Sequence, residues 1–466
     1  MKPQQWDKFL KQTAQEFGIT GKVRDIFLTR FAYENWRKPD KEIWPMAQSA
    51  SLESYKKQMT AIYAAFTANP AQGCTDLNAL SKGPGKFNVL RDWLQETRYA
   101  EWIYTPSTDR ATNMSILNYR TPLPAESPFY IERPPTESDC WQAIQQPGAL
   151  IRIKAPAQMG KTSLLRRLLF QARMTGYQVV YLNFLDAETS IFSSLDKVLQ
   201  WFCANICREL GLALQFEQYW AEDIYGSLMS CKSYVQGYLL PNVDNALVLG
   251  LDNVDRLFEY PLIAQDFLPM LRSWNEEANT QAIWQKIRLV LAHATEIYID
   301  LDVHQSPFNV GWPIKLSGFN VEQLRAVAQL YQLESKLAAL SPRFFQDLDT
   351  LLGGHPHLVH LTFDTLRRRM IPPEELLQQA PTQSGIYGEH LRGLWTTLQR
   401  QPQLAAAMQR VIADYPKARL EPIQAYQLES MGLVHLVGDC AQPSCELYRQ
   451  YFANRPIHYD SNSAGI

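Results

Sequence analysis

The residues best suited to chemistry lie in one short segment around Gly160-Lys161-Thr162. Backbone N–H groups at a helix start attract anionic phosphates, and a glycine lets the phosphates approach closely. The ammonium of Lys161 would neutralise the terminal phosphates, and the hydroxyl of Thr162 would bind Mg²⁺. The predicted ligands are therefore ATP or ADP with Mg²⁺. The residues predicted to hold the nucleotide here are Ala155, Pro156, Ala157, Gln158, Met159, Gly160, Lys161, Thr162 and Ser163.

The sequence on either side of this segment decides whether Gly-Lys-Thr is accidental. A short apolar run, Ala149–Ile153, precedes it and suits a buried strand. After Thr162, apolar residues recur at helical spacing, from Leu164 to Ala172. A strand, a loop and a helix in this order are the context in which a phosphate-binding loop is credible. The pattern G-x-x-x-x-G-K-[ST] is imperfect, because Ala155 occupies the first glycine position.

Polar residues follow two later apolar runs. Asp252 ends the run that begins at Ala246, and a carboxylate at the end of a central strand reaches Mg²⁺ beside the phosphate loop. Asp255 would orient the attacking water or add a second carboxylate; alternatively it caps the segment that follows. Thr295 or His293, after the run 287–292, is the candidate sensor of the γ-phosphate.

The elements that must position these residues form an α/β pattern. Apolar runs at 149–153, 179–184, 246–252 and 287–292 alternate with helical segments, including 193–209 and 227–238, which predicts a parallel sheet with flanking helices. The predicted parts are an all-helical N-terminal domain (1–104), a Pro-rich linker (105–135), a P-loop ATPase core (136–318), a helical lid (319–372), a winged-helix-like domain (384–453) and a disordered tail (454–466).

The flanking parts carry weaker signals. The end of the linker, from Phe129 to Glu137, contains Arg133 and would fold over the base, although an ordinary linker explains it nearly as well. In the last domain, Leu433–Gly438 is expected to pair with Glu446–Tyr448. For this domain and for the N-terminal bundle we favour docking to a protein over binding to DNA.

Composition limits the class of protein. The chain has 466 residues, 46% hydrophobic and 20% charged, with a net charge of −2, so nothing global points to nucleic acid. Residues 1–100 are mildly basic, with 15 Lys and Arg against 10 Asp and Glu. The seven scattered cysteines suit a reducing compartment, and no apolar run of 18 residues predicts a membrane span. The expected location is cytoplasmic.

The chain resembles the AAA-like ATPase family common in cyanobacteria, within the STAND class of signal-transduction ATPases. The N-terminal bundle more weakly resembles the helical domain of proteins associated with von Willebrand-A and MoxR systems. The resemblance covers about residues 127–453 and rests on Ser127–Pro134, Gly148–Leu165, Leu249–Asp255, Ser306–Gly311 and Gly353–Pro356.

The resemblance implies roles for several residues. Asp252 would be the Mg²⁺ acid and Asp255 the second acid of an Asp-x-x-Asp box. Pro356, with Gly354 and His355, would contact the nucleotide from the lid, and the winged helix would clamp the ADP state.

Departures from the family pattern predict slow turnover. Ala155 replaces a loop glycine, Asn253 stands where many AAA+ enzymes carry a catalytic Glu, and no Arg follows the fourth strand. The resulting hypothesis is a regulatory switch that is closed when it binds ADP. With ATP it would assemble into a nucleotide-dependent homo-oligomer. It would signal through an unidentified protein partner and not at a membrane. The alternatives are a DNA-associated AAA-type ATPase and a nucleotide-binding scaffold without hydrolysis.

Overall fold

The computed structural model describes residues 3–36, 38–67, 74, 76–77, 85–99, 121–294, 310–369, 371–453 and 455. These residues divide into two compact units, Met1–Leu117 and Asn118–Ile466, and each is described by itself. Thr295 and residues 105–120 lie outside the described residues, as do 454 and 456–466 of the predicted tail. Among the described residues, no helix has the length and apolar character needed to cross a membrane.

The described part of the first unit is helical. Its core combines aromatic and aliphatic side chains, and the indole N–H of Trp6 donates to the carbonyl of Phe31 at 2.7 Å. Its α-helices are α1 (Pro3–Glu16), α2 (Gly21–Phe31), α3 (Asp40–Met46), α4 (Leu52–Thr67) and α5 (Lys86–Trp93).

The second unit is built on a five-stranded parallel sheet with the order β2-β3-β4-β1-β5. The strands are β1 (Leu150–Lys154), β2 (Gln178–Asn183), β3 (Leu247–Asp252), β4 (Ile287–His293) and β5 (Trp312–Lys315). The first four coincide with the apolar runs of the sequence, because central parallel strands are buried on both faces. β5 was not predicted, since this edge strand is short, mostly exposed and contains Pro313.

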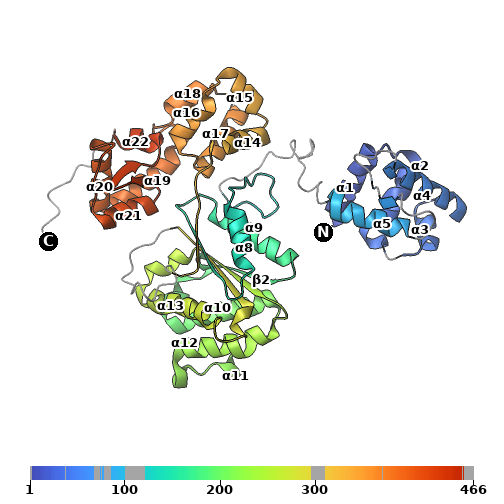
Figure 1. Cartoon of the computed structure of the whole chain (residues 1–466), viewed down its shortest axis with the longest axis horizontal. Helices are drawn as coiled ribbons and strands as arrows, with labels where there is room; N and C mark the ends of the chain where they lie inside the picture. The colour runs from blue at the N-terminus through green and yellow to red at the C-terminus, as the bar shows by residue number, and fades with distance from the viewer. Residues whose placement is uncertain are drawn as a thin grey trace. The chain divides into compact units, whose positions relative to one another are not determined.

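Helices cover both faces of the sheet (Figure 1). On one face, α8 (Thr136–Ile144) and α9 (Lys161–Met174) pack against Ile151, Ile153 and Val248. On the other face lie α10 (Leu195–Leu210), α12 (Glu222–Tyr234) and α13 (Pro261–Glu277), with the short α11 (Phe216–Tyr219) beside them.

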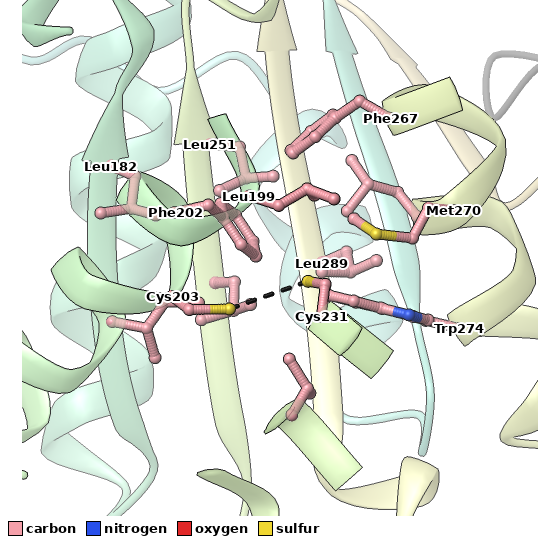
Figure 2. Close-up of a cluster of buried hydrophobic side chains, with 14 of the residues drawn as sticks. Leu182, Leu199, Phe202, Cys203, Cys231, Leu251, Phe267, Met270, Trp274 and Leu289 are labelled. Atoms are coloured by element: carbon pink, nitrogen blue, oxygen red, sulfur yellow. Dashed lines mark hydrogen bonds between the residues drawn. The ribbon is translucent and has the colours of Figure 1, made fainter. Parts of the chain in front are cut away.

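The core of the second face explains two cysteines that lie four residues apart in the sequence. Cys203 and Cys207 are fully buried in α10, and the sulfur of Cys203 lies 3.7 Å from that of Cys231 in α12 (Figure 2). Their neighbours are apolar side chains such as Phe202 and Leu251. Burial raises the pKa of the Cys203 thiol, as expected for a core thiol.

After β5 the chain is mainly helical. The helices are α14 (Val321–Leu330), α15 (Glu334–Leu340), α16 (Phe344–Leu352), α17 (Pro356–Arg369), α18 (Pro373–Gln379), α19 (Gly388–Gln399), α20 (Pro402–Ala413), α21 (Pro422–Ser430) and α22 (Glu446–Ala453). Helix α18 lies between the predicted lid (319–372) and the predicted winged-helix-like domain (384–453), where no element was predicted.

The hairpin in this region differs from the prediction. β6 (Val434–Val437) pairs antiparallel with β7 (Cys440–Pro443), not with Glu446–Tyr448. The reason is the two-residue turn Gly438-Asp439, in which Gly438 has a φ of +59°. Such a turn brings the chain back at once, and Glu446–Tyr448 begin α22 instead.

Candidate functional site

A cavity of about 280 Å³ lies at the carboxyl end of the sheet, beside the predicted phosphate loop. Its size is close to the lower end of the range of about 300–1,000 Å³ that is typical of small-molecule sites. The predicted residues that line it are Arg133, Ala157, Gln158, Met159, Gly160, Lys161, Thr162, Ser163 and Pro356. Ala155 and Pro156 instead line a neighbouring cavity behind the loop.

The backbone of the loop explains why Ala155 can replace the first glycine. The left-handed positions of the loop are Gln158, with a φ of +61°, and Gly160, with a φ of +94°. Ala155 is not among the positive-φ residues, so a Cβ there meets no backbone restriction. At Gly160, by contrast, a Cβ would also lie 3.2 Å from Nη2 of Arg133.

Lys161 is the first residue of α9 and is buried. Its Nζ donates to the carbonyls of Ala155 and Pro156, both at 2.8 Å, so its ammonium points back across the loop. Burial lowers the pKa of Lys161 to about 8, although the charges of Asp255 and Asp252 act in the opposite direction. An anionic group in the loop would supply the partner that a buried ammonium favours.

Asp252 ends β3 and is buried. Its carboxylate accepts from the hydroxyl of Tyr181 at 2.8 Å and from the backbone N–H of Asn253 at 3.1 Å. The hydrogen bond from Tyr181 comes from β2, the strand that pairs with β3, and fixes the carboxylate at the end of β3. Asp252 is not among the residues that line the cavity. Burial and the neighbouring Asp252 raise the pKa of Tyr181, which keeps its hydroxyl a donor.

Asp255 lies in the short 3₁₀-helix Val254–Glu259 that follows β3. Its carboxylate accepts from the backbone N–H of Ala294, at the end of β4, at 2.9 Å. Burial raises its pKa, opposed by this hydrogen bond and by Lys161. The sequence offered a cap of the following segment as the alternative role, but Asn253 holds the cap position.

Asn253 lines the cavity in a left-handed conformation, with a φ of +53°. Its side-chain N–H donates to the side-chain oxygen of Asn183 at 2.8 Å. Sequence reasoning missed Asn183. The register of the sheet could have found it, because Asn183 at the end of β2 pairs with Asp252 at the end of β3.

One wall of the cavity is formed by residues 121–133, called the strap below. Arg133 belongs to it and is buried; its guanidinium donates to the carbonyls of Met159 at 2.8 Å and Ser317 at 3.3 Å. Arg133 therefore braces the phosphate loop from behind Gly160. Phe129, Tyr130 and Ile131 of the strap also line this wall.

The helices after β5 contact the phosphate loop directly. The ring of His355, just before α17, is buried beside the backbone of Ala157. His390 of α19 lies 3.2 Å from the side-chain oxygen of Gln158 and 2.8 Å from the hydroxyl of Tyr448 in α22. Burial lowers the pKa of His390 to about 4, so the ring is neutral near pH 7.

Helix α21 and the turn after it complete these contacts. The Nζ of Lys154 donates to the hydroxyl of Tyr426 at 2.9 Å. Gly432 lies so close to the loop that a Cβ on it would be 2.7 Å from Pro156. Sequence reasoning identified none of these contacts to the loop and to Lys154, which join segments about 200 or more residues apart.

The second sensor candidate, His293, lies elsewhere. It is buried at the end of β4 and lines the cavity behind the loop, not the cavity of about 280 Å³. Burial lowers the pKa of His293 to about 3, so its ring is neutral near pH 7. The first candidate, Thr295, lies outside the described residues.

The residues brought together here fit a Mg²⁺-polyphosphate. The loop supplies backbone N–H groups at the start of α9 and an ammonium that contacts no carboxylate within the described part of the chain. Thr162 and Asp252 would supply oxygen ligands to Mg²⁺, which favours few protein ligands together with phosphate oxygens. When bound, Mg²⁺ would neutralise charge on the phosphates.

A solved structure shares this fold. The Walker-type ATPase PABY2304 of Pyrococcus abyssi is similar in structure, with a TM-score of 0.50 at 12% identity over 70% of this chain and 96% of that chain. The ADP form of the Aeropyrum pernix ORC2 protein gives a TM-score of 0.39 at 16% identity, over 74% of this chain and 96% of that one. No curated protein matches the sequence. A family model described as an AAA-like domain matches residues 118–454, and the chain therefore belongs to the AAA-like domain family.

Proposed function

We propose that this protein is an ATP- and ADP-binding regulatory switch of the STAND type that hydrolyses ATP slowly. The observation that carries the proposal is that the chain after β5 contacts the phosphate loop itself, through the hydrogen bond of His390 to Gln158 and through the buried His355 beside Ala157. Groups that touch this loop respond to whatever the loop binds. The nucleotide would therefore control the position of these helices.

Binding follows from the chemistry of the cavity. The N–H groups of Ala157–Thr162 and the ammonium of Lys161 would hold the phosphates. Thr162 and Asp252 would hold Mg²⁺. The base would lie against the strap and Pro356, where the wall turns from polar to aromatic.

Slow hydrolysis follows from the residue next to Asp252. Asn253 carries an amide, which cannot take a proton from water as a carboxylate does. One of its two N–H groups is directed to Asn183, which leaves its oxygen and its other N–H to orient a water molecule. Asp255 retains a carboxylate, but one that already accepts from Ala294. The site would therefore bind and position the nucleotide well but activate water only weakly.

The switch itself needs two states with different affinities for ADP and ATP. We assign the arrangement described above to the closed state, in which His390, Tyr426 and Gly432 cover the loop. In the ATP state these contacts would open and free a surface for assembly with further copies. The signal would pass to a protein partner, since the described parts hold no second catalytic constellation that we identify.

The test is to extract and identify the nucleotide that co-purifies with the full chain, and then to measure ATP binding and phosphate release. The proposal predicts bound ADP, tight binding of Mg²⁺-ATP and slow release of phosphate. Lys161→Ala should lose both binding and release, and Lys336→Ala, an exposed lysine of α15, should lose neither. Normal ATP affinity in Lys161→Ala would overturn the assignment of the site.

A further inference from the structure

The strap is fastened to α9, the helix that begins with the phosphate loop. The backbone N–H of Leu123 donates to the hydroxyl of Ser163 at 3.0 Å. One turn further along the same face of α9, Arg167 donates to the carbonyl of Ala125 at 3.2 Å and to the carboxylate of Glu132 at 2.7 Å. The helix therefore holds the strap near both of its ends.

Arg167 makes most of these contacts. Besides its two hydrogen bonds, its guanidinium carbon lies 4.8 Å from the ring centre of Tyr130. Its side chain is 25% exposed, and that of its partner Glu132 is 55% exposed. Arg167 thus spans the strap from Ala125 to Glu132, while it does not line the cavity itself.

The other side of the strap is held by the helices after β5. Phe129 is buried, with its ring 5.5 Å from that of Tyr331. The side-chain N–H of Gln323, in the first turn of α14, donates to the carbonyl of Glu132 at 2.6 Å. The strap is therefore clamped between α9 and the α14–α17 helices, and it closes the base side of the cavity.

We infer that Arg167 is a positioning residue that keeps the strap closed over the base and so sets how long a nucleotide stays bound. The inference rests on the proposed function, because it assumes that the cavity holds a nucleotide. A nucleotide must pass the strap to leave, whereas its phosphates are held by Lys161 and the loop. Loss of Arg167 therefore acts on the base and not on the phosphates.

The test compares two ligands that differ in the base. ADP contacts both the loop and the strap, and inorganic pyrophosphate contacts the loop alone. In Arg167→Ala, ADP should dissociate about tenfold faster. This is the effect expected when one exposed ion pair, one charged hydrogen bond and one cation–π contact are lost together. The affinity for pyrophosphate should be unchanged.

Three further variants keep the test decisive. Glu132→Gln removes the ion pair from the strap side at an exposed position, and it should accelerate ADP release to a smaller extent. Arg167→Lys should restore part of the slow release, and Arg173→Ala, an exposed arginine of the same helix, should change nothing. Unchanged ADP release in Arg167→Ala, or an equal loss of pyrophosphate affinity, would overturn the inference. If the unaltered protein binds neither ligand, the proposed function itself fails.

Discussion

Gly432→Ala should open the contact between the phosphate loop and the helices after β5. The added Cβ would lie 2.7 Å from both Cβ and Cγ of Pro156. The ring of Pro156 is rigid and cannot move away as the end of a flexible side chain could. The closed arrangement can accept this Cβ only if the turn after α21 moves off the loop.

Two effects contribute to the size of the change, and a control separates them. Gly432 has a φ of +76°, and an alanine in such a conformation costs about 1 kcal/mol wherever it occurs. Gly438→Ala has the same backbone cost, because Gly438 has a φ of +59°, but nothing lies within 4 Å of its Cβ. Overpacking adds about 2 kcal/mol to Gly432→Ala alone, which is a factor of about thirty in the population of the closed state.

Hydrogen exchange of the backbone amides measures this difference without any ligand. Peptides that cover Ala155–Met159 should exchange faster in Gly432→Ala than in the unaltered protein, since the loop loses its cover. The same peptides should be unaffected in Gly438→Ala, although this variant carries the same backbone cost of about 1 kcal/mol. Equal exchange of the loop in the two variants would refute the reasoning that Gly432 is a closing contact.

Two other predictions concern the chemistry of the site. The pKa of Lys161 is about 8, and phosphates stabilise its charged form, so ADP binding at pH 9 should be accompanied by the uptake of close to one proton. Titration calorimetry in buffers of different ionisation enthalpy measures this uptake. Binding without proton uptake would contradict the lowered pKa of the buried lysine. Asn253→Glu should raise phosphate release by about tenfold or more, since it supplies a general base, and Asn253→Gln should not. Equal rates in the two variants would mean that residue 253 does not limit hydrolysis.

The sheet and the loop could be predicted because their signals are local. The four central strands are continuous apolar runs, and the loop has its own residue pattern before a periodic helix. The same locality explains the errors. β5 contains Pro313 and has little apolar pattern, and the Gly438-Asp439 turn was passed over in favour of a more distant strand partner.

The rest of the site depends on contacts that no local pattern encodes. Gln158 and His390 are 232 residues apart, and nothing in either segment indicates the other. Tyr181 reaches Asp252, and Arg167 reaches Glu132 of the strap, only because the fold places β2 and α9 beside these residues. The sequence pattern requires a glycine where Ala155 stands. The residues with a positive φ in the loop are Gln158 and Gly160, so position 155 does not need a glycine.

The central claim is that the nucleotide governs the state of the molecule, and its mass in solution tests this most directly. Light scattering during size-exclusion chromatography would be recorded with ADP and with a slowly hydrolysed ATP analogue. The account predicts a monomer that retains ADP and a larger assembly with the analogue. The same mass with both nucleotides would contradict it, and retention on duplex DNA would then be the next property to measure.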